Sequence, residues 1–259
     1  STLGVERVSN PWLVITDRDI FIERKVSQAQ PRPPWFSNIG YYNQKGVEMF
    51  GLALLRVMET EQFFMDYPDG EIVDVRSFEA FCGAHYPGAL SIPIDRIGRY
   101  AGWLFDPGTP VLLVCDAMEQ AQKAKIEFGR VGFDHIVGFV RGSVTEHVAL
   151  GSYFATLPLI DAQRVRERIE SSPEGWALLD VRGVGVSAPD LLPGAKGFPR
   201  ATWRTSLLEL PTNIHYTLMC RTGGQAITAA SLMLQSGFSS VDVFLGSKRA
   251  WDLAGYTRT

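Results

Sequence analysis

EIVDVRSFEAFCGAHYPGALSIPI (residues 71–94) and WALLDVRGVGVSAPDLLPGAKGFP (residues 176–199) are two versions of one pattern. Each begins with an apolar run that ends in Asp-Val-Arg and continues to Pro-Gly-Ala. Downstream, VLLVCDAMEQA (111–121) corresponds to YTLMCRTGGQA (216–226), and both lead to a helix-like segment that closes in Gly-Phe. Such self-similarity indicates a tandem duplication of a unit of roughly 100 residues, which is a typical domain size.

Continuous apolar runs in both repeats predict strands that are buried on both faces. They lie at 72–75, 111–114, 177–180 and 217–219. Helical patterns separate them, for instance at 162–172 and 225–237. Because strands and helices alternate, the sequence predicts an α/β fold in which each repeat is a parallel sheet wrapped by helices.

Three parts are expected in the chain. An N-terminal segment occupies 1–52, a first domain 53–152 and a second domain 153–259. The prolines and aromatic residues of the first part, as in PRPPWFSNIGYYNQKG (31–46), predict an extended segment that wraps over a surface.

The composition is that of a globular protein, with 46% hydrophobic and 20% charged residues. A net charge of -3 and the lack of a Lys/Arg cluster argue against a nucleic-acid partner. No apolar run reaches the roughly 18–20 residues of a membrane span, and no signal-peptide pattern is present, so we expect no membrane association and a cytoplasmic location. The 3 cysteines are widely spaced, which agrees with a reducing compartment. Because the chain begins at Ser1, a fragment or processed product is left open.

The stretch CRTGGQA (220–226) has the features of an anion-binding loop between a strand and a helix. Helix-start amides lack partners inside the helix, and Gly223 and Gly224 let the backbone curl with those amides turned inward. The amides, the helix dipole and Arg221 would favour the thiolate form of Cys220 and make it reactive. The alternative is a buried structural cysteine that precedes a helix.

These motifs resemble those of a tandem of two rhodanese domains, the fold of thiosulfate and persulfide sulfurtransferases. The resemblance covers about four-fifths of the chain and rests on the Asp-Val-Arg signatures, the Pro-Gly-Ala turns, the loop CRTGGQ and the segment GSKRAW. It implies that Cys220 is the sulfur-carrying nucleophile. It also implies that the cradle around the sulfur consists of Arg221, Thr222, Gly223, Gly224, Gln225 and Ala226. Structural roles are expected for Asp74, Arg76, Asp180 and Arg182.

Two departures from the family pattern bear on function. Animal thiosulfate sulfurtransferases carry a lysine two positions after the cysteine, where Thr222 stands here, so a cation that grips thiosulfate is missing and a persulfide donor becomes more plausible. In the first repeat, Cys115 occupies the nucleophile position, but Asp116 and Glu119 follow it and no glycine does. Carboxylates raise the pKa of a neighbouring thiol and repel anions, so we interpret this loop as a degenerate site in a structural domain.

Phosphatases and arsenate reductases of a related fold are the competing interpretation of a cysteine loop. Their loop closes on an arginine six positions after the cysteine, since a tetrahedral phosphate requires a bidentate guanidinium. Here that position is Ala226, and Arg221 is adjacent to the thiol and cannot easily replace it. The loop therefore favours sulfur transfer over phosphate hydrolysis.

The first fifty or so residues resemble the stretch that follows the catalytic core in metallo-β-lactamase-fold persulfide dioxygenases, some of which are fused to rhodanese domains. The chain is thus similar to the tail of such a fusion. The metal site of that fold needs a His-x-His-x-Asp-His cluster, whereas the 4 histidines here are scattered singly. We expect no metal and no cofactor.

The resulting prediction is a sulfurtransferase that works by double displacement at Cys220. The expected small-molecule partners are thiosulfate or glutathione persulfide as donor and sulfite, a thiol or cyanide as acceptor. The alternative is a non-catalytic docking or regulatory module of a larger persulfide dioxygenase enzyme. A linked or associated dioxygenase domain is the expected protein partner, and a homo-oligomer is left open.

Overall fold

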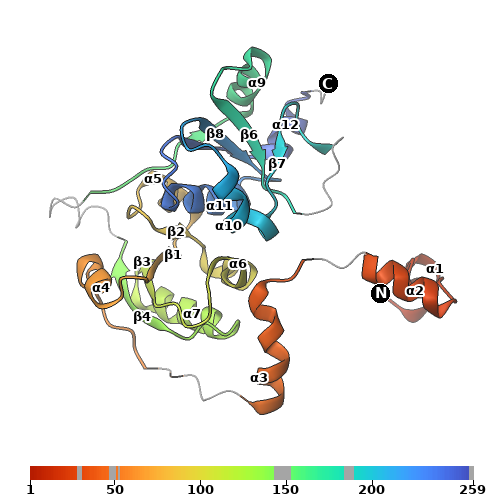
Figure 1. The fold of residues 1–259 in the computed structure, drawn as a ribbon, viewed down its shortest axis with the longest axis horizontal. Helices are drawn as coiled ribbons and strands as arrows, with labels where there is room; N and C mark the ends of the chain where they lie inside the picture. Colours follow the sequence, from red (N-terminus) through yellow and green to blue (C-terminus); the bar gives the residue numbers. More distant parts are fainter. Residues whose placement is uncertain (28–30, 47–50, 52, 143–152, 184–189, 257–259) are drawn as a thin grey trace. The chain divides into compact units, whose positions relative to one another are not determined.

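The computed structural model describes residues 1–27, 31–46, 51, 53–142, 153–183 and 190–256 (Figure 1). The chain forms two compact units, Ser1–Arg32 and Pro33–Thr259. The expected domain boundaries fall at residues 52 and 152, which lie outside the described residues. Within the described part of the chain, none of the helices combines the length and apolar character needed to cross a lipid bilayer.

Short helices occupy the first unit, where an extended segment was expected. They are α1 (Leu3–Ser9) and α2 (Arg18–Ser27). Each helix begins at a side chain that accepts hydrogen bonds from backbone amides. The Thr2 hydroxyl accepts from the amide three residues on at 3.4 Å, and the Asp17 carboxylate accepts from the amides two and three residues on, both at 2.9 Å. Such caps satisfy amides that the helix itself cannot, so local hydrogen bonding favours helix here.

The second unit begins with a 3-10 helix, η1 (Pro34–Asn38), and with α3 (Ile39–Lys45). Trp35 from η1 is buried, and its indole Nε1 donates a hydrogen bond to the carbonyl of Val131. Its ring lies 5.9 Å from that of Phe133, measured between centroids. These contacts hold the segment against residues 131–133 of the first repeat.

The first sheet has four parallel strands in the order β2-β1-β3-β4. In chain order they are β1 (Glu71–Asp74), β2 (Leu90–Ser91), β3 (Val111–Cys115) and β4 (Ile136–Arg141). Every residue of β3 is buried, as the continuous apolar run predicts. The accompanying helices are α4 (Thr60–Asp66), α5 (Phe78–Gly83), η2 (Ile94–Arg96), α6 (Ile97–Leu104) and α7 (Met118–Gly129).

The second sheet has five parallel strands in the order β5-β9-β8-β6-β7. They are β5 (Leu159–Ile160), β6 (Trp176–Asp180), β7 (Lys196–Gly197), β8 (His215–Met219) and β9 (Val241–Phe244). The helices are α9 (Ala162–Ser171), η4 (Arg200–Thr202), α10 (Trp203–Ser206), η5 (Leu207–Glu209), α11 (Gly224–Gln235) and α12 (Ser247–Leu253).

Corresponding strands have the same order in both sheets. β1, β2, β3 and β4 match β6, β7, β8 and β9, and a parallel bridge between Val57 and Phe139 takes the place of the pairing between β5 and β9. The structure therefore confirms the predicted α/β fold with two parallel sheets wrapped by helices, and its strand orders agree with a duplication.

Helix α11 lies beside β2 of the first sheet as well as within the second repeat (Figure 1). The hydroxyl of Thr228 donates to the carbonyl of Ser91 at 2.9 Å, and the amide of Ser91 donates to the hydroxyl of Ser231 at 3.0 Å. Eight consecutive residues of α11, from Ala226 to Met233, are buried. A helix that is buried all round can be apolar all round, and this packing fixes α11 against both repeats.

Candidate functional site

The predicted nucleophile lies at the carboxyl edge of the second sheet. In the strand register, Asp180 of β6 pairs with Gly197 of β7 and with Met219 of β8, so these residues mark one level of the sheet. Cys220 follows Met219 directly and begins the loop to α11. Ligands of open parallel sheets bind beyond this edge, so the sulfur is placed where a substrate is expected.

The Cys220 side chain is held inside its loop, and the residue is 3% exposed. The amide of Gly223 donates a hydrogen bond to Sγ of Cys220 at 3.1 Å. The amide of Cys220 itself donates to the hydroxyl of Ser247, at the start of α12, at 3.0 Å. Gly223 has φ 112°, a left-handed conformation that favours glycine. The loop thus curls so that at least one amide faces the sulfur, as the sequence predicts.

The amides of Gly224, Gln225 and Ala226 open α11 and have no acceptor within the helix, so they favour an anion at this end. The side-chain amide of Gln225 donates to the carbonyl of Val181 after β6, which ties the loop to the neighbouring strand. Arg221 and Thr222 have exposed side chains. The cradle in the structure is therefore made mainly by the main chain.

The Asp-Arg pair of the second repeat braces the same edge of the sheet. The amide of Arg182 and its Nε donate to Oδ1 of Asp180 at 3.0 and 2.9 Å, and Nη2 donates to Oδ2 at 2.5 Å. Nη2 also donates to the carbonyl of Asp190 at 2.8 Å. Hydrogen bonding to Asp180 raises the pKa of Arg182.

The first repeat contains the same brace. Arg76 donates through its amide and Nε to Oδ1 of Asp74, both at 3.0 Å, and through Nη2 to the carbonyl of Ala84 at 2.7 Å. Its Nη1 donates to the carbonyl of Gly142 at 2.9 Å. These contacts support the structural role predicted for both pairs.

Cys115 occupies the corresponding position in the first repeat, as the last residue of β3. It is 0% exposed, and burial raises the pKa of its thiol to about 12, with the Asp116 and Asp74 carboxylates adding to the effect. The amide of Asp116 donates to the side chain of Gln120 at 2.9 Å. A thiol with this pKa is protonated at neutral pH, so the geometry supports the interpretation of a degenerate site.

Phe78 of the first repeat reaches the Cys220 loop, and sequence reasoning missed it. A Cβ atom placed on Gly224 would lie 2.6 Å from Cε2 of Phe78 in α5. Tyr100 in α6 is 2% exposed, and burial raises the pKa of its phenol, with the negative form of Cys220 raising it further. The active loop is therefore bordered by both repeats.

We expect Gly224→Ala to disturb the Cys220 loop, because its methyl group would clash with the Phe78 ring. Such overpacking costs about 1–3 kcal/mol of stability, and sulfur transfer should fall with it. The double variant Gly224→Ala/Phe78→Ala, which removes the clash, should recover part of the lost stability and part of the lost sulfur-transfer activity. Denaturant unfolding and turnover assays measure the two effects. A double variant no better than Gly224→Ala would contradict this contact.

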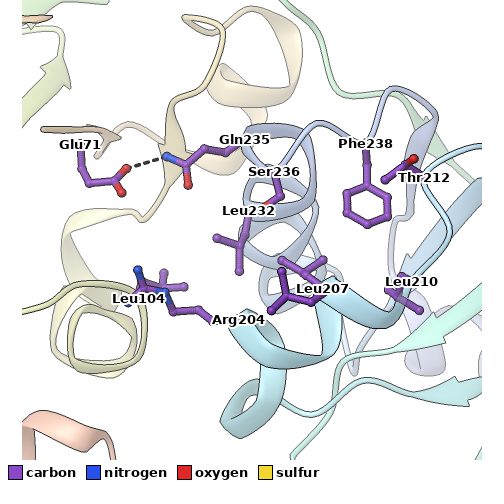
Figure 2. A pocket seen from close by; sticks show the side chains of 11 residues that line it. Glu71, Leu104, Arg204, Leu207, Leu210, Thr212, Leu232, Gln235, Ser236 and Phe238 are labelled. Atoms are coloured by element: carbon purple, nitrogen blue, oxygen red, sulfur yellow. Dashed lines mark hydrogen bonds between the residues drawn. The ribbon is translucent and has the colours of Figure 1, made fainter. Parts of the chain in front are cut away.

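A cavity of about 380 Å³ lies elsewhere between the two repeats (Figure 2). Its apolar wall includes Leu104, Leu207 and Leu232, and Gln235 donates to the Glu71 carboxylate at 2.6 Å on its polar side. No residue of the loop 220–226 lines it. This cavity is therefore not part of the Cys220 site.

Comparison with protein families gives a match over the first repeat. Residues 59–149 match the rhodanese-like domain. This part of the chain is similar to that domain. The match covers the domain with Cys115 and not the one with Cys220. The second repeat shares its strand order and its Asp-Arg brace with this part of the chain.

Solved structures similar to the chain include a metallo-beta-lactamase from Staphylococcus aureus, with 24% identity and TM-score 0.47 over 54% of this chain and 40% of that one. A thiosulfate sulfurtransferase from Pseudomonas aeruginosa has 18% identity and TM-score 0.34 over 72% of this chain and 39% of that one. A single domain sulfurtransferase from Saccharomyces cerevisiae has 19% identity and TM-score 0.36 over 39% of this chain and 93% of that one. No curated protein sequence matches the chain. The chain thus covers well under half the length of the first two proteins.

Proposed function

We propose that the protein is a sulfurtransferase that carries sulfane sulfur on Cys220. The observation that carries the proposal is the hydrogen bond from the Gly223 amide to Cys220 Sγ, at 3.1 Å, at the start of α11. An amide that donates to the sulfur stabilises its thiolate and, after transfer, the negative charge of the bound persulfide. The match of residues 59–149 to the rhodanese-like domain supports the same family of chemistry.

The reaction consists of two displacements at sulfur. In the first, the Cys220 thiolate attacks the outer sulfur of the donor, an S–S bond forms, and the donor's own S–S bond breaks. With thiosulfate, sulfite leaves with the electron pair; with glutathione persulfide, the glutathione thiolate leaves. In the second, the acceptor attacks the outer sulfur and Cys220 leaves as thiolate. The transfer needs no external oxidant or reductant.

Mass spectrometry of the intact chain tests this proposal. Incubation with thiosulfate or glutathione persulfide should add the mass of one sulfur atom, and peptide mapping should place it at Cys220. Addition of sulfite or a thiol should remove it. Cys82 and Cys115 serve as internal controls, since burial raises the pKa of each thiol to about 12.

A docking or regulatory module is the second candidate, and the buried Cys115 of the first domain favours it for that half of the chain. The same experiment separates the two functions. If neither donor adds mass at any cysteine, the docking role replaces sulfur transfer as the best proposal for the whole chain.

A further inference from the structure

Arg200, the first residue of η4, has buried polar atoms without a partner. Its Nε and Nη1 are fully buried and make no hydrogen bond to the described residues. Nearly all buried polar groups in folded proteins are hydrogen-bonded, and a buried cationic donor without an acceptor is costly. An anion that binds at this place when substrate is present would supply the missing acceptor.

The position of Arg200 connects it with the Cys220 loop. It follows Gly197 by three residues, and Gly197 marks the same level of the sheet as Met219, after which Cys220 comes. The guanidinium carbon lies 5.6 Å from the centroid of the Tyr100 ring and 5.5 Å from that of Trp103, so two aromatic side chains of the first domain hold it by cation–π contact.

The charges of Arg200 and of Cys220 both act on the pKa of the Tyr100 phenol. Burial raises the pKa of its phenol most, the Arg99 and Arg200 charges lower it, and the negative form of Cys220 raises it.

The duplication provides an internal comparison. SIPI (91–94) in the first repeat corresponds to GFPR (197–200) in the second, so Ile94 is the counterpart of Arg200. The repeat with the buried, protonated Cys115 has an apolar residue at this position, and the repeat with the Cys220 loop has a cation. Of the two repeats, the one with the Cys220 loop is therefore also the one with a cation at this position.

We propose that Arg200 binds the anionic group of the sulfur donor and positions its outer sulfur at Cys220. This inference rests on the proposed function and deepens it by naming the donor class, a small molecule with a sulfonate or carboxylate group. A planar guanidinium suits such oxyanions because it can donate two parallel hydrogen bonds. Arg200 would supply the cation that Thr222 does not. Its second-domain backbone and first-domain aromatic contacts would make the donor site a product of both repeats.

Steady-state kinetics of Arg200→Gln with thiosulfate test the proposal. KM should rise about tenfold or more while kcat changes by less than about twofold, since the lost contact is a hydrogen-bonded charge pair that acts in binding. Arg200→Lys keeps the positive charge but cannot donate two parallel hydrogen bonds, so its KM should lie between those of the wild type and Arg200→Gln. Arg204→Gln is the matched control, because Arg204 is an exposed cation on the next helix, where it forms an exposed ion pair with Asp106 at 3.6 Å. A KM for Arg200→Gln equal to that of the control would overturn the proposal.

A parallel series with glutathione persulfide identifies the group that is bound. A rise in KM for thiosulfate alone would mean that Arg200 binds the sulfonate group. A rise in KM for both donors would mean that it binds carboxylates as well. Unchanged KM values with both donors would again overturn the proposal. Thermal unfolding shows whether Arg200→Gln folds. If it does not, Arg200→Met, which keeps an apolar side chain beside the aromatic rings, takes the place of Arg200→Gln in each experiment.

Equilibrium binding separates this proposal from the proposed function. In the Cys220→Ser background no sulfur can be loaded, and thiosulfate binding can be followed by tryptophan fluorescence, since Trp103 packs on the guanidinium. The added Arg200→Gln change should weaken binding about tenfold or more. That result would stand even if the wild-type protein took up no sulfur. Equal affinity with and without Arg200 would overturn the anion site while leaving sulfur transfer at Cys220 intact.

Discussion

Cys220→Ser is expected to abolish sulfur transfer, with a fall in kcat/KM on the order of 10³-fold or more. The serine hydroxyl is not ionised at neutral pH and is a far weaker nucleophile toward sulfur than a thiolate. It still fits the loop and still accepts the hydrogen bond that the Gly223 amide now donates to Sγ at 3.1 Å. The variant should therefore fold normally, and turnover with thiosulfate or glutathione persulfide as donor measures the loss.

Cys115→Ser is the matched control, because it makes the same atomic change at the corresponding position of the first domain. Its activity should stay within about twofold of the wild type, since burial keeps this thiol protonated, with a pKa raised to about 12. A hydroxyl placed in a fully buried site costs about 1–3 kcal/mol of stability, so thermal unfolding should be measured beside turnover. If Cys115→Ser removed activity and Cys220→Ser did not, the assignment of the two repeats would be reversed.

The architecture could be predicted from the sequence because the duplication and the buried strands leave strong local patterns. The apolar runs that end at Asp74, Asp180 and Met219 correspond to β1, β6 and β8. Strands of two residues escape such an analysis, since they are too short for any periodicity. β2 and β7 lie inside the segments that follow the Pro-Gly-Ala turns, and only pairing with β1 and β6 makes them strands.

The candidate site could be predicted only as far as it is local in sequence. The curl of the Cys220 loop follows from Gly223 and from the start of a helix, both of which lie within a few residues of the thiol. Packing between the two repeats brings Phe78 to the loop and brings Tyr100 and Trp103 to Arg200, which neither the composition nor the spacing of these residues indicates. The one sequence signal was the contrast between Ile94 and Arg200 at matched positions of the repeats.

Asp74→Asn is expected to produce the largest loss of stability, about 3–5 kcal/mol. Arg76 is buried, with a side chain that is 4% exposed, and Asp74, at 0%, supplies its only carboxylate partner within 4 Å among the described residues. Asparagine keeps the shape and one acceptor oxygen but removes the charge, so the buried guanidinium loses its ion-pair partner. The carbonyls of Ala84 and Gly142, at 2.7 and 2.9 Å, cannot neutralise it. Urea unfolding of the variant and the wild type measures the difference.

Asp180→Asn makes the same change in the second domain and serves as the comparison. There the Arg182 side chain is 19% exposed, so water can solvate the guanidinium when the carboxylate is lost. The loss should be smaller, about 1–3 kcal/mol. The order of the two variants is the decisive result, since both pairs share nearly the same hydrogen-bond geometry and differ mainly in burial. An equal or larger loss for Asp180→Asn would mean that burial of the Arg76 pair does not set its contribution to stability.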